Sequence, residues 1–95
     1  MDDEELKSIY LRGLVSQLEA LQMARNNYVH DISEVSDRLR RLAHQLRGSG
    51  GSYGFPDITI MAGKLEDSSP ESIVTHTDNL IELLKKLTAH FTFQK

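Results

Sequence analysis

Four residues between positions 44 and 51 bring together a nucleophilic side chain, a permanent cation and bare backbone. Arg47, Gly48 and Gly51 follow His44 at offsets of +3, +4 and +7, which place all four on one face of an α-helix. An exposed imidazole is mostly neutral near pH 7, so one ring nitrogen has a lone pair that can attack an electrophile. Arg47 offers a fixed charge and a fork of donors to phosphoryl oxygens. The spacing predicts that His44 can accept a phosphoryl group and that Arg47 can stabilise it.

The glycines that follow the histidine disfavour a continuing helix. Glycine in a helix interior costs about 0.8–1 kcal/mol relative to alanine, so glycines at 48, 50, 51 and 54 would together cost roughly 3–4 kcal/mol. Either the helix ends at Arg47, or the bare backbone has a use. We expect Gly48 and Gly51 to leave room beside His44 for the surface of another macromolecule. The alternative is a glycine-rich helix end and loop, with Gly54 as the turn.

Nucleotide-binding motifs are absent from this segment. A P-loop requires lysine and then serine or threonine after its last glycine, but Phe55 and Pro56 follow Gly54. A dinucleotide fingerprint that starts at Gly48 requires glycine at its sixth position, where Tyr53 stands, and a strand before it. The segment is therefore not predicted to bind a nucleotide.

The sequence predicts neither a metal site nor a catalytic base for His44. His30, His76 and His90 have no zinc-binding spacing, and we expect them to be structural or incidental. No carboxylate cluster predicts bound magnesium, and no carboxylate base is identified beside the candidate nucleophile. We expect no metal and no cofactor on this chain, which would carry a phosphoryl group without energising its transfer and would not be an enzyme by itself.

Hydrophobic periodicity predicts four helices and no strand. We expect them over about residues 3–26, from Asp31 or Ser33 onward, from Pro56 to near Asp67, and from Ser69-Pro70-Glu71 onward. The apolar stripes are Leu6, Ile9, Tyr10, Leu14, Leu18 and Leu21; Ile32, Val35, Leu39, Leu42 and Leu46; Ile58, Met61, Ala62 and Leu65; and Ile73, Thr77, Leu80, Leu84, Leu87 and Phe91. Short connections favour antiparallel neighbours, so the prediction is an all-α, antiparallel up-and-down four-helix bundle that forms one domain over residues 1–95.

The candidate site lies on the polar side of the second helix. His44 points about 160° away from the centre of the apolar stripe, so we expect its ring to face water. An ordinary exposed histidine is the alternative. Arg38, Arg40, Arg41 and Arg47 lie within ten residues that contain no acid, and we expect Arg40 and Arg41 to add longer-range attraction for a phosphoryl group. A solvated basic helix face is the alternative for them.

Composition narrows the class of protein. The 95 residues are 39% hydrophobic and 26% charged, which is typical of a folded chain. The net charge of −3 argues against a general nucleic-acid binder. No apolar run approaches the roughly 20 residues that span a bilayer, the start is acidic, and cysteine is absent, so we expect a cytoplasmic protein without a membrane partner.

The histidine segment resembles the histidine-containing phosphotransfer domain. The family pattern has a small residue before the histidine, then a hydrophobic residue at +2, a basic residue at +3 and glycines at +4 and +10. Here these are Ala43, His44, Leu46, Arg47, Gly48 and Gly54, and the stretch Met61 to Glu66 looks like the next helix of the family. The chain departs from the pattern at Arg47, where lysine is commoner, and at Gly50-Gly51, where small non-glycine residues are usual.

The resemblance implies a phosphorelay role. His44 would receive a phosphoryl group from the aspartate of a response-regulator receiver domain, or from a sensor histidine kinase, and pass it to another receiver aspartate. The partner would bring the magnesium and the acidic pocket. Arg47 would stabilise the phosphoryl group, Gly48 and Gly51 would give the receiver clearance, and the chain is expected to act as a monomer.

Apolar contact with a receiver is assigned to the first helix. Leu11 and Val15 lie roughly opposite the centre of its main stripe, and we expect them to form a docking patch. The alternative is that the helix contacts two neighbours and buries a wide stripe. Lys64 is expected to lie near enough to the second helix to help hold phosphate, although a solvated lysine needs no such function.

Three other classes of protein compete with this interpretation. A helical adaptor would bind receiver or kinase partners through the same face without being phosphorylated, and His44 would then be replaceable. In the dimerisation hairpin of a histidine kinase an acid typically follows the histidine and a proline comes soon after; here Gln45 follows, and the next proline is Pro56. An enzyme with its own active site is disfavoured because the nucleophile lacks a base and a cofactor motif.

Overall fold

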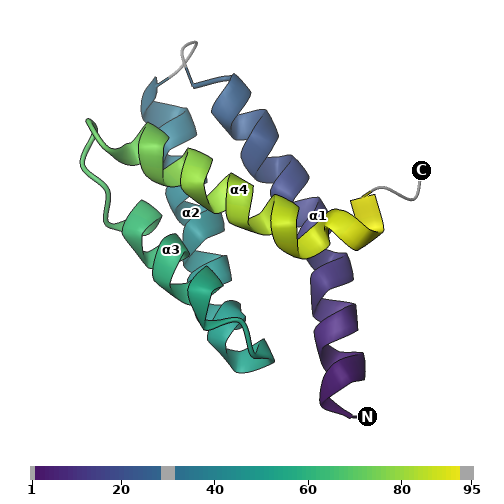
Figure 1. Cartoon of the computed structure of the whole chain (residues 1–95). Coiled ribbons are helices and arrows are strands. Elements are labelled where there is room, and N and C mark those ends of the chain that lie inside the picture. The colour runs from purple at the N-terminus through teal and green to yellow at the C-terminus, as the bar shows by residue number, and fades with distance from the viewer. Residues whose placement is uncertain (1, 29–31, 93–95) are drawn as a thin grey trace.

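Four α-helices and one short 3₁₀ helix make up most of the described part of the chain. The computed structural model describes residues 2–28 and 32–92, with the backbone alone for residues 91 and 92. The elements are α1 (Asp3–Asn26), α2 (Ile32–Gly50), the 3₁₀ helix η1 (Gly51–Tyr53), α3 (Pro56–Glu66) and α4 (Ile73–Thr92). No strand occurs in these residues, and the chain reverses direction from α1 to α2 and again to α3 (Figure 1). The predicted all-α four-helix bundle is confirmed.

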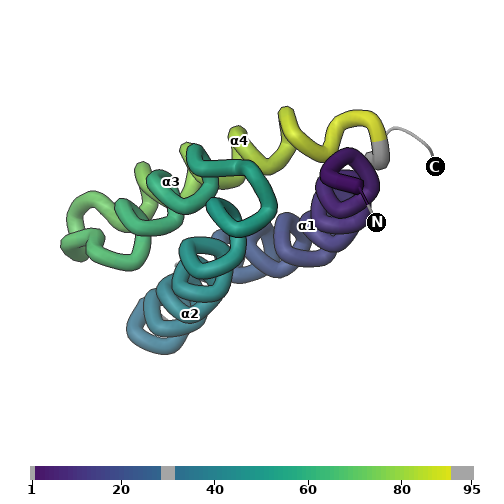
Figure 2. Tube along the Cα trace, turned by 90° about the horizontal axis from the view of Figure 1, so that it is seen from below, coloured from purple at the N-terminus to yellow at the C-terminus, as the bar shows by residue number. Residues whose placement is uncertain are grey.

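The helices form two close pairs. α2 packs mainly against α3, and α1 packs mainly against α4, while α3 also contacts α4. Figure 2, seen from below, shows α3 beside both α2 and α4, with α1 at the other end of α4. Arg25 Nε donates to Asp78 Oδ1 at 2.9 Å across the α1–α4 pair. The α2–α3 pair carries His44, so the geometry between these two helices decides what surrounds the histidine.

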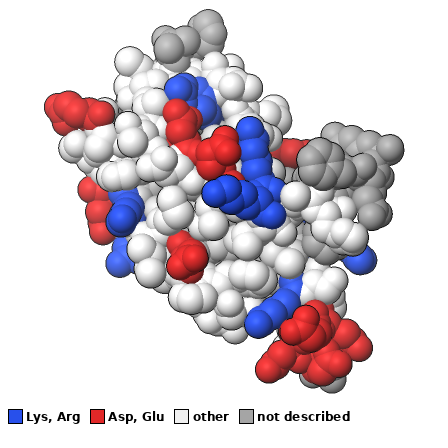
Figure 3. Space-filling model, in the orientation of Figure 1, with Lys and Arg blue, Asp and Glu red and all other residues white. Residues whose placement is uncertain are grey.

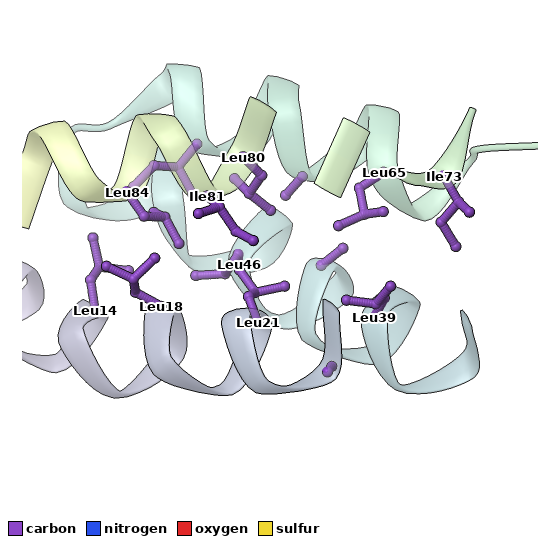
Figure 4. Close-up of a cluster of buried hydrophobic side chains, with 14 of the residues drawn as sticks. Leu14, Leu18, Leu21, Leu39, Leu46, Leu65, Ile73, Leu80, Ile81 and Leu84 are labelled. Carbon is purple, nitrogen blue, oxygen red and sulfur yellow. The ribbon is translucent and has the colours of Figure 1, made fainter. Parts of the chain in front are cut away.

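One hydrophobic cluster receives side chains from all four helices (Figure 4). Its fully or nearly fully buried members include Leu14, Leu18 and Leu21 of α1, Leu39 and Leu46 of α2, Ile58 and Leu65 of α3, and Ile73, Leu80 and Leu84 of α4. Burial of a leucine or isoleucine side chain contributes about 1.5–3 kcal/mol to the stability of the fold. Since both α2 and α3 are anchored in this cluster, their outer faces are held at a fixed register.

Most helix ends agree with the sequence. α1 spans the predicted residues, and Oδ1 of Asp2 caps it by accepting from the N–H of Glu5 at 2.8 Å. α3 begins at Pro56 as predicted. The proposed cap at Asp31 lies outside the described residues. The predicted start of the fourth helix is wrong by three residues, because residues 70–72 form a turn in which the side chain of Ser72 accepts from the N–H of Ser69.

Three residues that the periodicity assigned to the core are exposed. Leu6 and Ile9 in α1 are 38% and 55% exposed, and Ile32 in α2 is 56% exposed. Figure 1 shows that the N-terminal half of α1 extends past the point where α4 crosses it, so its apolar stripe continues beyond its packing partner. Ile32 is the first residue of its helix and also lies at the edge of the cluster. The side chain of Phe91 lies outside the described part of the chain.

The glycine-rich segment continues α2 and then turns the chain. The helix reaches Gly50, so it does not end at Arg47. A Cβ on Gly50 would lie 2.8 Å from the Cβ of Ile58, so this glycine allows α2 and α3 to approach closely. Gly54 has a φ of +89°, in the left-handed region that favours glycine, and forms the predicted turn before Pro56. These two glycines set the spacing and the turn of the α2–α3 pair.

Candidate functional site

His44 lies on the outer face of α2, and its side chain is 75% exposed. The ring therefore faces solvent, as the periodicity of the helix predicts. Its Nδ1 is 2.7 Å from Oε2 of Glu66, the last residue of α3. The expectation that no carboxylate lies beside the histidine is wrong, because α3 supplies one from 22 positions further along the chain.

Glu66 joins the histidine to the arginine. Nη1 of Arg47 donates to Oε1 of Glu66 at 3.1 Å and lies 3.8 Å from Oδ2 of Asp67. The hydrogen bonds from Arg47 and then from His44 lower the pKa of the Glu66 carboxyl below its ordinary value. Glu66 is thus held as a carboxylate between the two residues that the sequence singled out.

The antiparallel register of α2 and α3 explains this arrangement. When a chain reverses between two packed helices, residues at equal distances from the turn lie side by side. His44 and Glu66 each lie 11 positions from Phe55, and Arg47 and Gly63 each lie eight positions from it. Counting outward from Phe55, the residue after the predicted turn at Gly54, is the signal that could have identified Glu66.

The carboxylate determines which ring nitrogen is free. An ionised carboxylate can only accept hydrogen bonds, so the proton of the neutral imidazole resides on Nδ1. Nε2 then carries the lone pair, and no described residue forms a hydrogen bond with it. The site holds a nucleophilic nitrogen that points away from its carboxylate partner.

The two glycines on the histidine face differ in their surroundings. A Cβ on Gly48 would meet nothing within 4 Å, so no internal contact requires glycine there and its absence of a side chain leaves open surface. Gly51 is exposed at the start of η1, and its N–H donates to Oγ1 of Thr59 in α3 at 2.8 Å. Gly48 therefore leaves open surface on the histidine face, whereas a Cβ on Gly51 would lie 3.4 Å from Oγ1 of Thr59.

The other predicted cations lie at different distances from the site. Nη2 of Arg40 donates to the carbonyl of Ser68 at 2.8 Å, which ties α2 to the connection between α3 and α4. Arg41 is exposed and forms no ion pair with the described residues. Lys64 is exposed on α3 and lines a shallow depression together with Arg47 and His76. Arg47 is therefore the one predicted cation in contact with the carboxylate that binds His44 in the described structure.

The predicted docking residues of the first helix are partly enclosed. Leu11 packs against the hydrophobic cluster, and Val15 is half-buried. A different flank of α1 borders α2, where a groove of about 310 Å³ lies next to the histidine helix. The groove residues outside the core are Ile9, Tyr10, Gly13 and Gln17 from α1 and Gln45 and Ser49 from α2. Ile9 and Gly13 thus line the groove between α1 and α2, and neither Leu11 nor Val15 lines it.

Aromatic side chains close one end of this groove. The hydroxyl of Tyr10 lies 2.7 Å from Oγ of Ser49, and its ring stacks on Tyr53 with centroids 4.6 Å apart. Burial raises the pKa of the Tyr10 hydroxyl. Four acidic residues, Asp2, Asp3, Glu4 and Glu5, cap and begin α1 near this end. Figure 3 shows acidic side chains gathered at the N-terminal end of α1, at the bottom of the view.

Within residues 2–28 and 32–92, no cluster of three or more histidine and acidic side chains could hold a metal ion. In the same residues, no helix has both the length and the apolar character that crossing a membrane requires.

The fold and the site define a small helical protein in which an exposed histidine is held by a carboxylate that also binds an arginine. The family model of the Hpt domain matches residues 5–90. The chain therefore belongs to the Hpt domain family, whose members are phosphocarriers in two-component phosphorelays rather than classical enzymes. Searches of curated proteins and of solved structures found no match.

Proposed function

We propose that this chain is a phosphocarrier that accepts a phosphoryl group on Nε2 of His44. The donor is either the phosphorylated aspartate of a receiver domain or, alternatively, a kinase domain. The acceptor in the next step is the aspartate of another receiver. The observation that carries the proposal is the exposed ring whose Nδ1 is 2.7 Å from the Glu66 carboxylate. An exposed histidine without such a partner would have no fixed tautomer.

The proposed transfer needs no proton to leave the histidine. The lone pair of Nε2 attacks phosphorus, an N–P bond forms, and the P–O bond to the receiver aspartate breaks with its electron pair remaining on the aspartate carboxylate. The ring then carries a positive charge, and the proton stays on Nδ1 facing Glu66. A carboxylate at this position stabilises that charge. Onward transfer is the same step in reverse, with the second aspartate as the nucleophile.

Arg47 is assigned to the phosphoryl oxygens. Its side chain is 48% exposed, and its guanidinium has five N–H donors, of which one contacts Glu66. The remaining donors can turn toward a phosphoryl group on the neighbouring Nε2. We propose that the receiver domain holds the magnesium, as the resemblance to the phosphotransfer family implies.

The receiver is proposed to dock over the glycine face of α2 and the groove beside it. Gly48 and Gly51 are exposed, and Ile9 offers apolar surface that is 55% exposed across the groove. We favour Ile9 and Gly13 over Leu11 and Val15 as the docking residues of α1, because Leu11 is already used by the core. A monomer and a cytoplasmic location remain predictions that rest on the sequence.

Phosphotransfer from a labelled receiver tests the proposal. Incubation of the chain with a phosphorylated receiver domain and magnesium should give an acid-labile, base-stable phosphate. Peptide mapping should locate it at His44, and nuclear magnetic resonance should assign it to Nε2. A His44→Gln variant that accepts label normally would contradict the site assignment.

The same experiment separates the carrier from the adaptor. An adaptor would bind a receiver or kinase partner with equal affinity in the wild type and the His44→Gln variant, and neither protein would take up label. Binding measured by titration calorimetry alongside labelling therefore distinguishes the two functions.

A further inference from the structure

A hydroxyl group from α3 bridges the last step of the α2 hydrogen-bond ladder. In an α-helix the N–H of Gly51 points toward the carbonyl of Arg47, four residues earlier. Oγ1 of Thr59 contacts both groups: it accepts from the N–H of Gly51 at 2.8 Å and donates to the carbonyl of Arg47 at 2.9 Å. One side chain thus ties both ends of this helical step to the neighbouring helix.

Thr59 lies on the face of α3 that packs along Arg47. Thr59, Gly63 and Glu66 lie at spacings of four and three residues, so they share one side of the helix. A Cβ on Gly63 would lie 3.5 Å from Nε of Arg47, which shows that the arginine side chain runs over this glycine toward Glu66. The backbone of Arg47 is therefore held at Thr59 and its side chain at Glu66.

The segment that Thr59 holds is weak by itself. Gly48, Gly50 and Gly51 lower the helix-forming tendency of the last turn of α2, and helix ends leave backbone groups without helical partners. Regions with exposed backbone hydrogen bonds open locally without global unfolding. The Thr59 hydroxyl bridge opposes this local opening at the turn that carries Arg47, Gly48 and Gly51.

We propose that Thr59 is a positioning residue for phosphoryl transfer to His44. Its hydroxyl fixes the main chain between Arg47 and Gly51. The Arg47 guanidinium and the surface at the glycines are thereby kept in the positions that phosphoryl transfer to Nε2 requires. Thr59 touches neither the histidine ring nor the transferred group, and it acts through Arg47. The inference rests on the proposed carrier function.

The test compares Thr59→Val with Thr59→Ser. Valine keeps the shape of the side chain and removes both hydrogen bonds, whereas serine keeps the hydroxyl. Single-turnover transfer from a phosphorylated receiver with magnesium is measured over a range of receiver concentrations. We expect Thr59→Val to lower the maximal rate about twofold to fivefold and to leave the half-saturating receiver concentration within about twofold. Thr59→Ser should restore the rate, and Thr75→Val, on the exposed face of α4, should match the wild type.

Amide hydrogen exchange supplies a second measurement that does not depend on the relay. In Thr59→Val the amide of Gly51 should exchange about tenfold faster, while the amide of Leu80 in the core should be unchanged. A wild-type transfer rate in Thr59→Val, a loss that serine does not restore, or an equal rise in exchange at Leu80 would each overturn the positioning role. A wild-type chain that takes no label contradicts the carrier function itself, and this role with it.

Discussion

His44 and His76 both direct Nδ1 at a side-chain oxygen, but the two rings differ in exposure and in the charge of that partner. The distance is 2.7 Å from His44 to Glu66 and 2.6 Å from His76 to Oγ of Ser68. His44 is 75% exposed on α2, whereas His76 is half-buried near the start of α4. The partner is an anionic carboxylate in the first case and a neutral hydroxyl in the second.

The hydroxyl of Ser68 is already part of another contact. It donates to the carbonyl of Lys64 at 2.8 Å, so it accepts from Nδ1 of His76. The carbonyl of Ser68 in turn accepts from Arg40. This network joins α2, α4 and the connection that follows α3, and the partner that it gives His76 is a neutral hydroxyl. Both rings have the same tautomer, so the charge of the partner and the exposure of the ring are what distinguish them.

Exchange of each histidine for glutamine is the strongest test of this comparison. We expect His44→Gln to lose phosphoryl uptake from a phosphorylated receiver by at least about 100-fold, because the nucleophile itself is removed. His76→Gln should retain most of the uptake. The measurement is label incorporation at equal protein concentration, and a large loss in His76→Gln with its fold intact would remove the distinction.

Removal of the charge of Glu66 should cause the next largest decrease in the rate of phosphoryl transfer. Glu66→Gln keeps the size of the side chain but no longer offsets the positive charge of the phosphorylated ring. We expect the single-turnover rate to fall about tenfold, as for the loss of a hydrogen bond to a charged group.

Ser68→Ala is the matched control at the other histidine. We expect it to lower the free energy of unfolding by about 1 kcal/mol, equivalent to a decrease in Tm of about 4–8 °C, with the transfer rate unchanged. Equal transfer rates in Glu66→Gln and the wild type would mean that the carboxylate does not matter to the reaction.

Truncation of Arg47 should slow transfer to a smaller extent. We expect Arg47→Ala to lower the rate about fivefold, since the phosphoryl oxygens lose a charged donor while Glu66 still holds His44. The free energy of unfolding should change by less than about 1 kcal/mol, because the side chain is half exposed. Arg41→Ala is the control for general loss of positive charge, and a similar decrease in both variants would argue against a specific role.

The smallest expected effect is a pH dependence that belongs to Glu66 and has no counterpart at Ser68. The pKa of Glu66 is lower in the folded protein than its ordinary value, first because of Arg47 and then because of His44. The ionised Glu66 carboxylate therefore contributes its full stabilisation at a pH above its ordinary pKa. This stabilisation is lost as the pH falls through the lowered pKa of the folded protein. The Tm difference between the wild type and Glu66→Gln should shrink on acidification through this range. A difference that stays constant would show that the pair does not depend on the ionised carboxylate.

Much of the fold follows from local sequence. The bounds of α1, the start of α3 at Pro56, the turn at Gly54 and the outward direction of His44 all depend on residues within a few positions of each other. Helical periodicity and backbone preferences act over this range, so they can be derived without knowledge of packing. The same reasoning placed Arg47 and Gly48 on the exposed face of the helix beside His44.

Tertiary structure decided what surrounds these residues. The approach of Glu66 to His44 depends on the register of α2 against α3, which the continuation of α2 to Gly50 and its close contact with Ile58 set. The exposure of Ile9 depends on where α4 crosses α1. The hydrogen bond from Arg40 to the carbonyl of Ser68 depends on the path of the chain after α3. A hydrophobic stripe specifies which face of a helix is buried but not which helix covers it or at what height. The outward-facing histidine was therefore predictable from the sequence, whereas its carboxylate partner, the ring nitrogen that this partner leaves free and the bridge at Thr59 required the packed pair of helices.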